Sequence, residues 1–262
     1  MSDTDSIRVS SLHRYPVKGL RPQDLAEVSV EAGETLPYDR AWAIENGRGR
    51  FDPNAPKHLP KINFLMLMRN ERLAALEVEF DEATHTLTLL RNGKQVVRGA
   101  LDTAMGRQLI EQFMAGYMEN DLRGAPHIVN APGHNFTDVA IKCVHIVNLA
   151  SVRELERAVG RPVDPMRFRA NVYIESQQPW EEFGWVGQRI RIGGTVFDVI
   201  DRTTRCAATN VDPQTADRDM AIPAALMRAY GHEDFGVYAT VAERGTIRRG
   251  DTVTLISERV TL

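Results

Sequence analysis

Short stretches with alternating apolar residues, separated by turn-forming residues, fill the first hundred residues of the chain. Stretches such as IRVSSLHRYPV, LAEVSV, LAALEVEF and THTLTLL are rich in β-branched residues or place apolar side chains at every second position. Clusters of Gly, Pro, Asn and Asp, among them ENGRGR, lie between them. Because side chains of a strand alternate between two faces, this pattern predicts half-buried strands that end at turns. Several short strands at this spacing predict a small β-barrel or sandwich.

Three helices are predicted from apolar spacing and from the residues at their ends. One follows Asp102, where apolar residues recur at helical spacing. In SVRELERAVGRP, Ser151 and Glu154 match a capping box, and Gly160 suits the left-handed residue that ends a helix. In IPAALMRAYG the proline stands at a tolerated early position, and Gly231 ends the helix.

Strands and helices together predict a mainly β protein with helices, of the α+β class. IKCVHIVN, FGVYATV and DTVTLI are predicted strands, and RIRIGGTVFDVI is a predicted hairpin that turns at Gly193 and Gly194. The stretch FDPNAPKHLPK is predicted to be a loop, because its prolines exclude a central strand. We expect two domains, a β-barrel-like one over residues 1–100 and a second one over residues 101–262.

Composition excludes several classes of protein. The chain has 262 residues and a formal net charge of −3, which argues against a general nucleic-acid binder. No apolar run reaches the roughly 20 residues that a membrane helix needs, and the start MSDTDSIRVSS does not resemble a secretory signal. The two cysteines, Cys143 and Cys206, provide no disulfide framework. We therefore expect a cytoplasmic protein that does not associate with membranes.

Cys206 stands among small polar residues, in RTTRCAATNVDP, where a buried thiol would normally have aliphatic neighbours. Three interpretations are open: a packed thiol, a nucleophile, and a metal ligand. A nucleophile needs a base, and four histidines are candidates: His127, His134, His145 and His232. A metal-bound thiol must lose its proton, which nearby Arg202 and Arg205 would favour. A zinc site is not indicated, since the chain has neither CxxC nor HExxH.

Basic residues recur at the edges of predicted strands, beside an aromatic residue or a proline. They are Lys18 in YPVKG, Arg40 in YDRAW, and Arg167 and Arg169 in MRFRANVYI. Each one alone fits a solvated surface charge. Together they fit a pocket for an anionic, phosphate-bearing cofactor, because arginine binds phosphate oxygens in a two-pronged geometry. One thiolate beside such a pocket suits a metal that is carried by an organic cofactor.

These residues resemble a known family. RFRANVYI, RCAATNVDPQT, FGVYATV and GTIRRGD resemble a MOSC domain, the domain named after the C-terminal part of molybdenum cofactor sulfurases. YPVKG and YDRAW resemble the β-barrel domain that often precedes it. The resemblance spans nearly the whole chain and is specific where RFRxN is followed by RCxxTxVDP and FGxY. It implies an N-terminal β-barrel-like domain and a C-terminal MOSC β-barrel with flanking helices.

The resemblance also implies roles for individual residues. Cys206 is the implied protein ligand to molybdenum, and Cys206, Asn171 and Asp212 are the implied catalytic residues. The residues implied to hold the molybdenum cofactor (Mo-molybdopterin) are Lys18, Arg40, Arg169, Asn171, Thr204, Arg205, Thr209 and Tyr238. Asp212 precedes Pro213, so a turn-forming aspartate is the alternative interpretation. The chain departs from the family at Gly19, where a serine is frequent, and in the loop FDPNAPKHLPK.

Similarity to the amidoxime-reducing proteins implies a molybdenum-dependent oxidoreductase that reduces small N-hydroxylated substrates by oxygen-atom transfer. Electrons are expected from a separate protein of the ferredoxin, flavoprotein or cytochrome type, since no dinucleotide-binding GxGxxG follows a strand. One alternative is a molybdenum cofactor carrier or sulfur-transfer protein without turnover. Another is a hydrolase that uses the thiol and one of the histidines.

Overall fold

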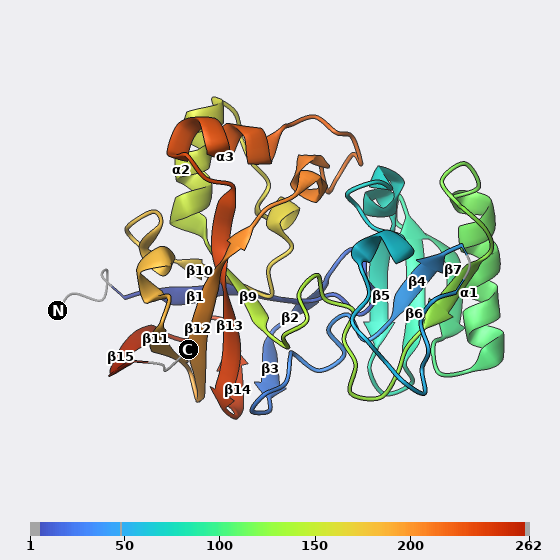
Figure 1. Cartoon of the computed structure of the whole chain (residues 1–262), viewed down its shortest axis with the longest axis horizontal. Helices are drawn as coiled ribbons and strands as arrows, with labels where there is room; N and C mark the ends of the chain where they lie inside the picture. The colour runs from blue at the N-terminus through green and yellow to red at the C-terminus, as the bar shows by residue number, and fades with distance from the viewer. Residues whose placement is uncertain (1–5, 48, 260–262) are drawn as a thin grey trace.

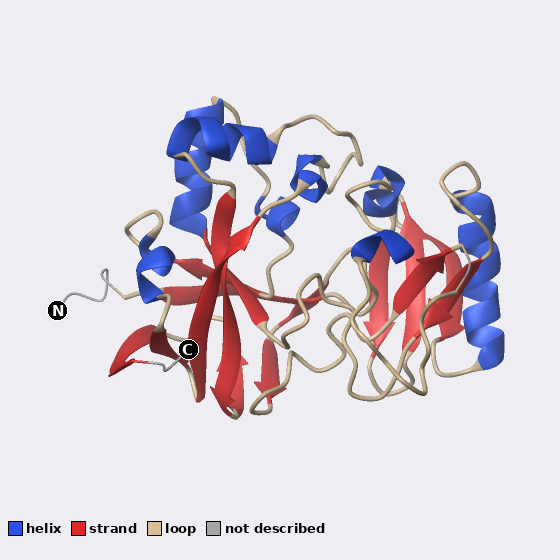
Figure 2. Cartoon of the chain, in the orientation of Figure 1, coloured by secondary structure: helices blue, strands red, loops and turns tan. Residues whose placement is uncertain are grey.

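A computed structural model describes residues 6–47 and 49–259 of the chain. It shows a mainly β protein with three α-helices, which confirms the predicted α+β class (Figures 1 and 2). The larger lobe is built on an eight-stranded sheet in the order β15-β11-β12-β13-β9-β10-β1-β2. Its strands are β1 (Arg8–Arg14), β2 (Gln23–Leu25), β9 (Val144–Asn148), β10 (Val172–Glu175), β11 (Gln188–Ile192), β12 (Thr195–Thr204), β13 (Asp234–Glu243) and β15 (Val253–Arg259).

β1 and β2 lie in the large sheet, whose other strands all come from the C-terminal half of the chain. β1 pairs antiparallel with β10, with Leu12 opposite Val172, and β10 pairs parallel with β9. β3 (Glu27–Val30) pairs with β14 (Gly245–Arg248). Leu12 and Val172 are buried in the core of this lobe. The start of the chain therefore anchors the smaller lobe to the larger one.

The smaller lobe contains two small sheets and one long helix. β5 (Glu77–Asp81), β6 (Thr86–Arg91) and β7 (Lys94–Ala100) form one sheet, and β4 (Ala43–Asn46) pairs with β8 (Pro126–Val129). The predicted helix is α1 (Ala104–Tyr117), which Thr103 caps by accepting from the Gly106 N–H. Short 3₁₀ helices occur in both lobes: η2 (Lys61–Asn63) and η3 (Glu71–Ala75) in the smaller one, and η4 (Pro165–Phe168), η5 (Glu181–Trp185) and η6 (Ala207–Asn210) in the larger one.

α1 lies directly after the domain division expected near residue 100. Its Ile110 and Met114 nevertheless pack with Leu87 and Leu89 of the preceding strands. The division itself stays a prediction. Among the described residues, no helix has the length and apolar character needed to cross a membrane.

α2 (Leu149–Val159) and α3 (Ile222–Tyr230) lie together at one end of the large sheet (Figure 1). Both end as predicted, with Gly160 and Gly231 in the left-handed conformation at φ of 73° and 76°. The predicted N-terminal cap of α2 is wrong by three residues. Asn148, not Ser151, accepts from a backbone N–H of the first turn, that of Ala150.

The Ser151 hydroxyl does not cap the helix, because it donates a hydrogen bond to a buried carboxylate. This hydroxyl lies 2.9 Å from Oε1 of Glu182 in η5, and Asn148 donates to the other oxygen at 3.1 Å. Glu182 is completely buried. Burial raises the pKa of Glu182 from 4.5 to about 7, although these hydrogen bonds partly oppose the rise.

Glu182 predicts that the protein loses stability as the pH rises through mildly acidic values. The folded state keeps the Glu182 proton between pH 4.5 and about 7, where the unfolded chain releases it. The free energy of unfolding therefore falls over this window, by roughly 3 kcal/mol, and stays level above it. Urea unfolding at pH 5 and pH 8 measures the difference. Glu182→Gln removes most of it, whereas the control Glu181→Gln retains it; equal slopes in the two variants contradict the assignment.

Candidate functional site

Cys206 follows the end of β12 and precedes η6, with its side chain half-buried. Thr209 fixes the backbone at this point, because its N–H and hydroxyl both donate to the Cys206 carbonyl, at 3.0 and 2.9 Å. The thiol lines a pocket with about 820 Å³ of empty space, a figure that includes solvent at its mouth. Six residues of the implied cofactor set line the same pocket: Lys18, Arg40, Arg169, Asn171, Arg205 and Tyr238.

Lys18 and Arg40 reach the pocket from the N-terminal part of the chain. Beyond β1, Val17 pairs with Trp42 in an isolated bridge, so Lys18 and Arg40 lie close together. Nη1 of Arg40 lies 3.2 Å from the side-chain oxygen of Asn171, and its Nη2 donates to the Arg169 carbonyl at 3.1 Å. A residue of the N-terminal part therefore bonds directly to residues of the C-terminal half at the pocket.

Arg40 and Arg169 share one aromatic support. Both guanidinium groups lie 4.4 Å from the ring centroid of Tyr15, which is completely buried. Both residues also adopt the left-handed backbone conformation, at φ of 50° and 53°. Such a conformation costs a non-glycine residue about 1–3 kcal/mol and is concentrated at functional sites. Two residues in a strained backbone conformation thus hold their cations against the same ring.

The pocket has more positive than negative charge. Five cationic side chains line it (Lys18, Arg40, Lys61, Arg169 and Arg205), and Asp138 is the carboxylate among the lining residues. Burial lowers the pKa of both Lys18 and Arg169. Within the described part of the chain, the Arg169 guanidinium makes no hydrogen bond, although it is stacked on Tyr15. An anionic ligand would supply the missing partner, so the donor set fits a phosphate-bearing molecule.

Asp138 and Lys61 are site residues that the sequence analysis missed. Asp138 receives Lys18 Nζ at 2.5 Å and Lys61 Nζ at 3.2 Å, and Lys61 Nζ also lies 3.4 Å from Cys206 Sγ. Burial alone would raise the pKa of Asp138, but the two lysines hold it well below its usual range. For Lys61, Asp138 and the Cys206 sulfur outweigh burial and raise the pKa. A charged residue is therefore held against the sulfur.

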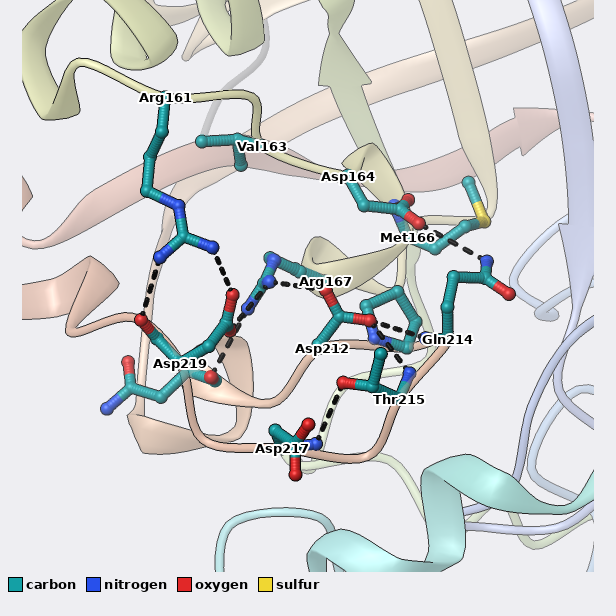
Figure 3. Close-up of polar contacts among 12 residues, drawn as sticks. Arg161, Val163, Asp164, Met166, Arg167, Asp212, Gln214, Thr215, Asp217 and Asp219 are labelled. Atoms are coloured by element: carbon teal, nitrogen blue, oxygen red, sulfur yellow. Dashed lines mark hydrogen bonds and ion pairs between the residues drawn. The ribbon is translucent and has the colours of Figure 1, made fainter.

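Thr204, Thr209 and Asp212 do not line this pocket. Thr204 donates to Asp234 at 2.8 Å, and Thr209 is completely buried beneath Cys206. Asp212 faces away, toward Arg167, at 2.9 Å (Figure 3). Its other oxygen accepts from two backbone N–H groups that follow it, those of Gln214 and Thr215. This geometry is that of a turn-forming aspartate.

Arg167 is the centre of the ion-pair network in Figure 3. Its side chain is 2% exposed, and Nη2 bonds both Asp212 and Asp219, at 2.9 and 2.8 Å. Nη1 donates to the Asn210 carbonyl at 3.2 Å, and Arg161 binds the other oxygen of Asp219. The network holds the loop that follows Cys206, so Arg167 acts as an internal brace of this loop.

One of the four candidate histidines lines the pocket, namely His145. It is buried, with Nε2 3.4 Å from Arg205 Nη1, and burial first and the arginine second lower its pKa well below the ordinary value. The other three lie in other surroundings: His127 beside Glu111, His134 against Phe51, and His232 against Trp180. The second cysteine, Cys143, is buried, and burial raises its pKa to about 12.

The Asp212 geometry predicts a loss of stability when its charge is removed. Asp212→Asn weakens the bond to the buried Arg167, which we expect to lower the free energy of unfolding by about 2 kcal/mol. Urea denaturation measures the change. Asp217→Asn, an exposed position of the same loop, is the matched control and should be neutral. Unchanged stability of Asp212→Asn would show that the pair with Arg167 is not structural.

Gly19, where the family often has serine, is required by the backbone next to Lys18. Its φ is +86°, and an added Cβ would lie 2.8 Å from the Leu65 carbonyl oxygen. Gly19→Ser should therefore destabilise the protein by about 1–3 kcal/mol. Gly33→Ser is the control, because Gly33 has a similar φ of +74° but open space around its Cβ position. Thermal unfolding compares them, and an equal loss in both variants would exclude the contact with Leu65.

Comparison with known proteins places this geometry in a family. Residues 6–121 match the family model of the MOSC N-terminal beta barrel domain, and residues 133–254 match that of the MOSC domain. Molybdenum cofactor sulfurase from Danio rerio is 33% identical over 90% of this chain and 32% of its own length. Mitochondrial amidoxime-reducing component 1 from Mus musculus is 29% identical over 43% of this chain and 36% of its own length.

The chain thus spans about a third of the length of these curated relatives. The crystal structure of the YUAD protein from Bacillus subtilis superposes with a TM-score of 0.45 at 13% identity, over 95% of this chain and 94% of that one. The two matched domains together account for the pocket, since Lys18 and Arg40 lie in the first and Cys206 in the second. The chain is therefore a MOSC-domain protein, in which a MOSC N-terminal β-barrel domain precedes the MOSC domain.

Proposed function

We propose that this protein binds the molybdenum cofactor in the Cys206 pocket and reduces N-hydroxylated compounds with it. The observation that carries the proposal is the position of the Cys206 thiol in a pocket with cationic side chains from both domains. The names of the related sulfurases and amidoxime-reducing components support a function that involves this cofactor.

The residues of the pocket fit both parts of such a cofactor. A thiolate is a soft, strongly donating ligand for a redox metal, which suits Cys206. The Arg169 guanidinium has no hydrogen-bond partner in the described part of the chain, so it can donate to a phosphate or another anionic oxygen. Lys18, Arg40 and Arg205 would add positive charge around the ligand. Small residues after the cysteine, Ala207 and Ala208, leave room for a bulky pterin.

The bound cofactor would supply oxygen-atom transfer, the chemistry that removes oxygen from an N–OH group. The overall reaction consumes two electrons and two protons, converts N–OH to N–H, and releases water. We assign the electrons to a separate donor protein of the ferredoxin, flavoprotein or cytochrome type. Lys61 holds a proton on Nζ next to the Cys206 sulfur, and Asp138 orients it there. This lysine is our candidate for a proton donor at the site.

A second function, a carrier or sulfur-transfer protein for the same cofactor, is favoured by one observation. The cofactor sulfurase aligns with 90% of this chain, whereas the amidoxime-reducing component aligns with 43%. The two functions share the pocket and differ in turnover. Stoichiometric molybdenum without reduction of any N-hydroxylated compound would support the carrier.

Metal analysis of the purified protein tests the proposal. Produced in a host that makes the cofactor, the protein should contain about one molybdenum and one pterin per chain. The molybdenum content of Cys206→Ala should be at least ten-fold lower, because the proposed protein ligand is gone. Cys143→Ala is the control, because Cys143 is the other cysteine that lines the pocket; this variant should retain its molybdenum. Reduction of benzamidoxime with an artificial electron donor then separates a reductase from a carrier, and background molybdenum in the unmodified protein refutes both.

A further inference from the structure

A second cavity, which we call the aromatic cavity after Tyr38, Trp42 and His85 in its lining, shares no lining residue with the Cys206 pocket. Arg40, from the same segment as Tyr38 and Trp42, lines the Cys206 pocket instead, so this segment lies between the two spaces. The other lining residues come from the chain after β3, the turn between β5 and β6, the residues before α1 and the segment after β8. The cavity has about 1030 Å³ of empty space, a figure that includes solvent at its mouth. This size is sufficient for a small organic molecule.

One wall of the cavity is aromatic. The rings of Tyr38 and Trp42 are stacked, with their centroids 6.2 Å apart and an angle of 13° between their planes. The centroid of the His85 ring lies 5.1 Å from that of Tyr38 and 5.7 Å from that of Trp42. Trp42 is 4% exposed, and its indole Nε1 is buried without a hydrogen-bond partner among the residues that the structure describes. Because the faces of such rings attract cations, the wall offers both apolar surface and affinity for positive charge.

The acidic residues Glu31, Glu34 and Asp102 also line the cavity. Within the described ranges of the chain, no lysine or arginine lines it. Lys142 Nζ pairs with Glu34 at 2.5 Å, and His85 Nδ1 lies 3.5 Å from Asp102 Oδ2. Glu31 and Asp102 are exposed, so they give the cavity a negative charge. This charge is opposite to that of the pocket around the thiol.

One cation already lies against the aromatic wall from outside the cavity. The guanidinium carbon of Arg14 lies 5.5 Å from the centroid of the Tyr38 ring, and Arg14 Nη1 pairs with Glu82 at 2.8 Å. Neither Arg14 nor Glu82 lines the cavity. Because the charge of Arg14 is paired with Glu82, this arginine does not neutralise Glu31 or Asp102.

We propose that the aromatic cavity binds a small organic cation, an amine or amidine with a flat apolar body. The positive group lies among the carboxylates of Glu31 and Asp102, and the apolar body lies against Tyr38 and Trp42. The rings bury the body of such a ligand, and the carboxylates balance its charge. An anion would be repelled by the same carboxylates. The proposal does not depend on molybdenum, because the aromatic cavity and the Cys206 pocket have no residue in common.

Two probes of similar size separate charge from shape. Benzylamine is positively charged at pH 8, whereas benzyl alcohol is neutral. In ligand-observed NMR titrations of the full chain, the Kd of benzylamine should be about five-fold lower than that of benzyl alcohol. Asp102→Asn should raise the Kd of benzylamine about five-fold and change that of benzyl alcohol less than about two-fold. Glu119→Gln, exposed beyond the other end of α1 and outside the cavity, is the matched control and should change neither Kd.

Tyr38→Leu tests the aromatic wall. It should raise the Kd of both probes about five-fold, because the ring that contacts them is gone, whereas Tyr38→Phe keeps the ring and should change either Kd less than about two-fold. A salt titration of the unmodified protein needs no folded variant. High salt should weaken the binding of benzylamine and leave that of benzyl alcohol unchanged, because salt screens only the charged probe.

The location of the bound cation is checked with Cys206→Ala. This variant should bind benzylamine as the unmodified protein does, whether or not either protein contains molybdenum. The proposal is overturned if the two probes bind equally, if Asp102→Asn leaves the Kd of benzylamine unchanged, or if Cys206→Ala abolishes its binding. Benzylamine binding and molybdenum content therefore test the two sites separately.

Discussion

Like charges crowded into one pocket are the constraint on which this structure depends. Burial lowers the pKa of Lys18 and of Arg169, and neighbouring arginines lower it further: Arg40 and Arg169 act on Lys18, and Arg40 acts on Arg169. Two devices offset the repulsion. Carboxylates stand beside the cations, Asp138 among them, and the Tyr15 ring supports two guanidinium groups with the negative face of its π-system. A bound anion would offset the repulsion further.

The path of the chain makes this crowding possible. Because β1 pairs with β10, the residues that follow β1 are fixed next to the sheet that bears Cys206. Arg218 adds a second tie, since it donates to the Leu67 and Met68 carbonyls of the smaller lobe and to the Ala207 carbonyl beside the thiol. The pocket therefore forms only where the two domains meet. Neither domain alone contains both the sulfur and its cationic surroundings.

The pocket is needed for both proposed functions, the reductase and the cofactor carrier, whereas a groove beside it is needed only for the reductase. Tight binding of a cofactor needs only the pocket, so a carrier and a reductase make the same use of Cys206 and its neighbours. The groove, lined by Cys206, Lys61 and Asp138, opens beside the pocket, and in a reductase it would leave room for a second molecule. Lys61 and Asp138 line both the pocket and the groove, so a molecule bound in either one lies next to them.

Local interactions are what the sequence by itself determined. The α+β class, the helix ends at Gly160 and Gly231, and the Gly193–Gly194 hairpin depend on residues a few positions apart, and all were predictable. Other features depend on contacts with residues that are far away in the sequence. Ser151 leaves its predicted cap because Glu182 captures its hydroxyl, and Asp212, open to two interpretations in the sequence, turns to the buried Arg167.

The same division holds at the site. Cys206 stands out in the sequence because its neighbours are small and polar, and the family resemblance supplied most of the cationic residues around it. Lys61 begins the short 3₁₀ helix η2 and Asp138 lies in a loop, and neither belongs to a periodic pattern or a motif that would mark it in the sequence. They become site residues only when the fold brings one loop from each lobe to the sulfur. That proximity arises from strand pairing between distant segments, which the tertiary structure alone decides.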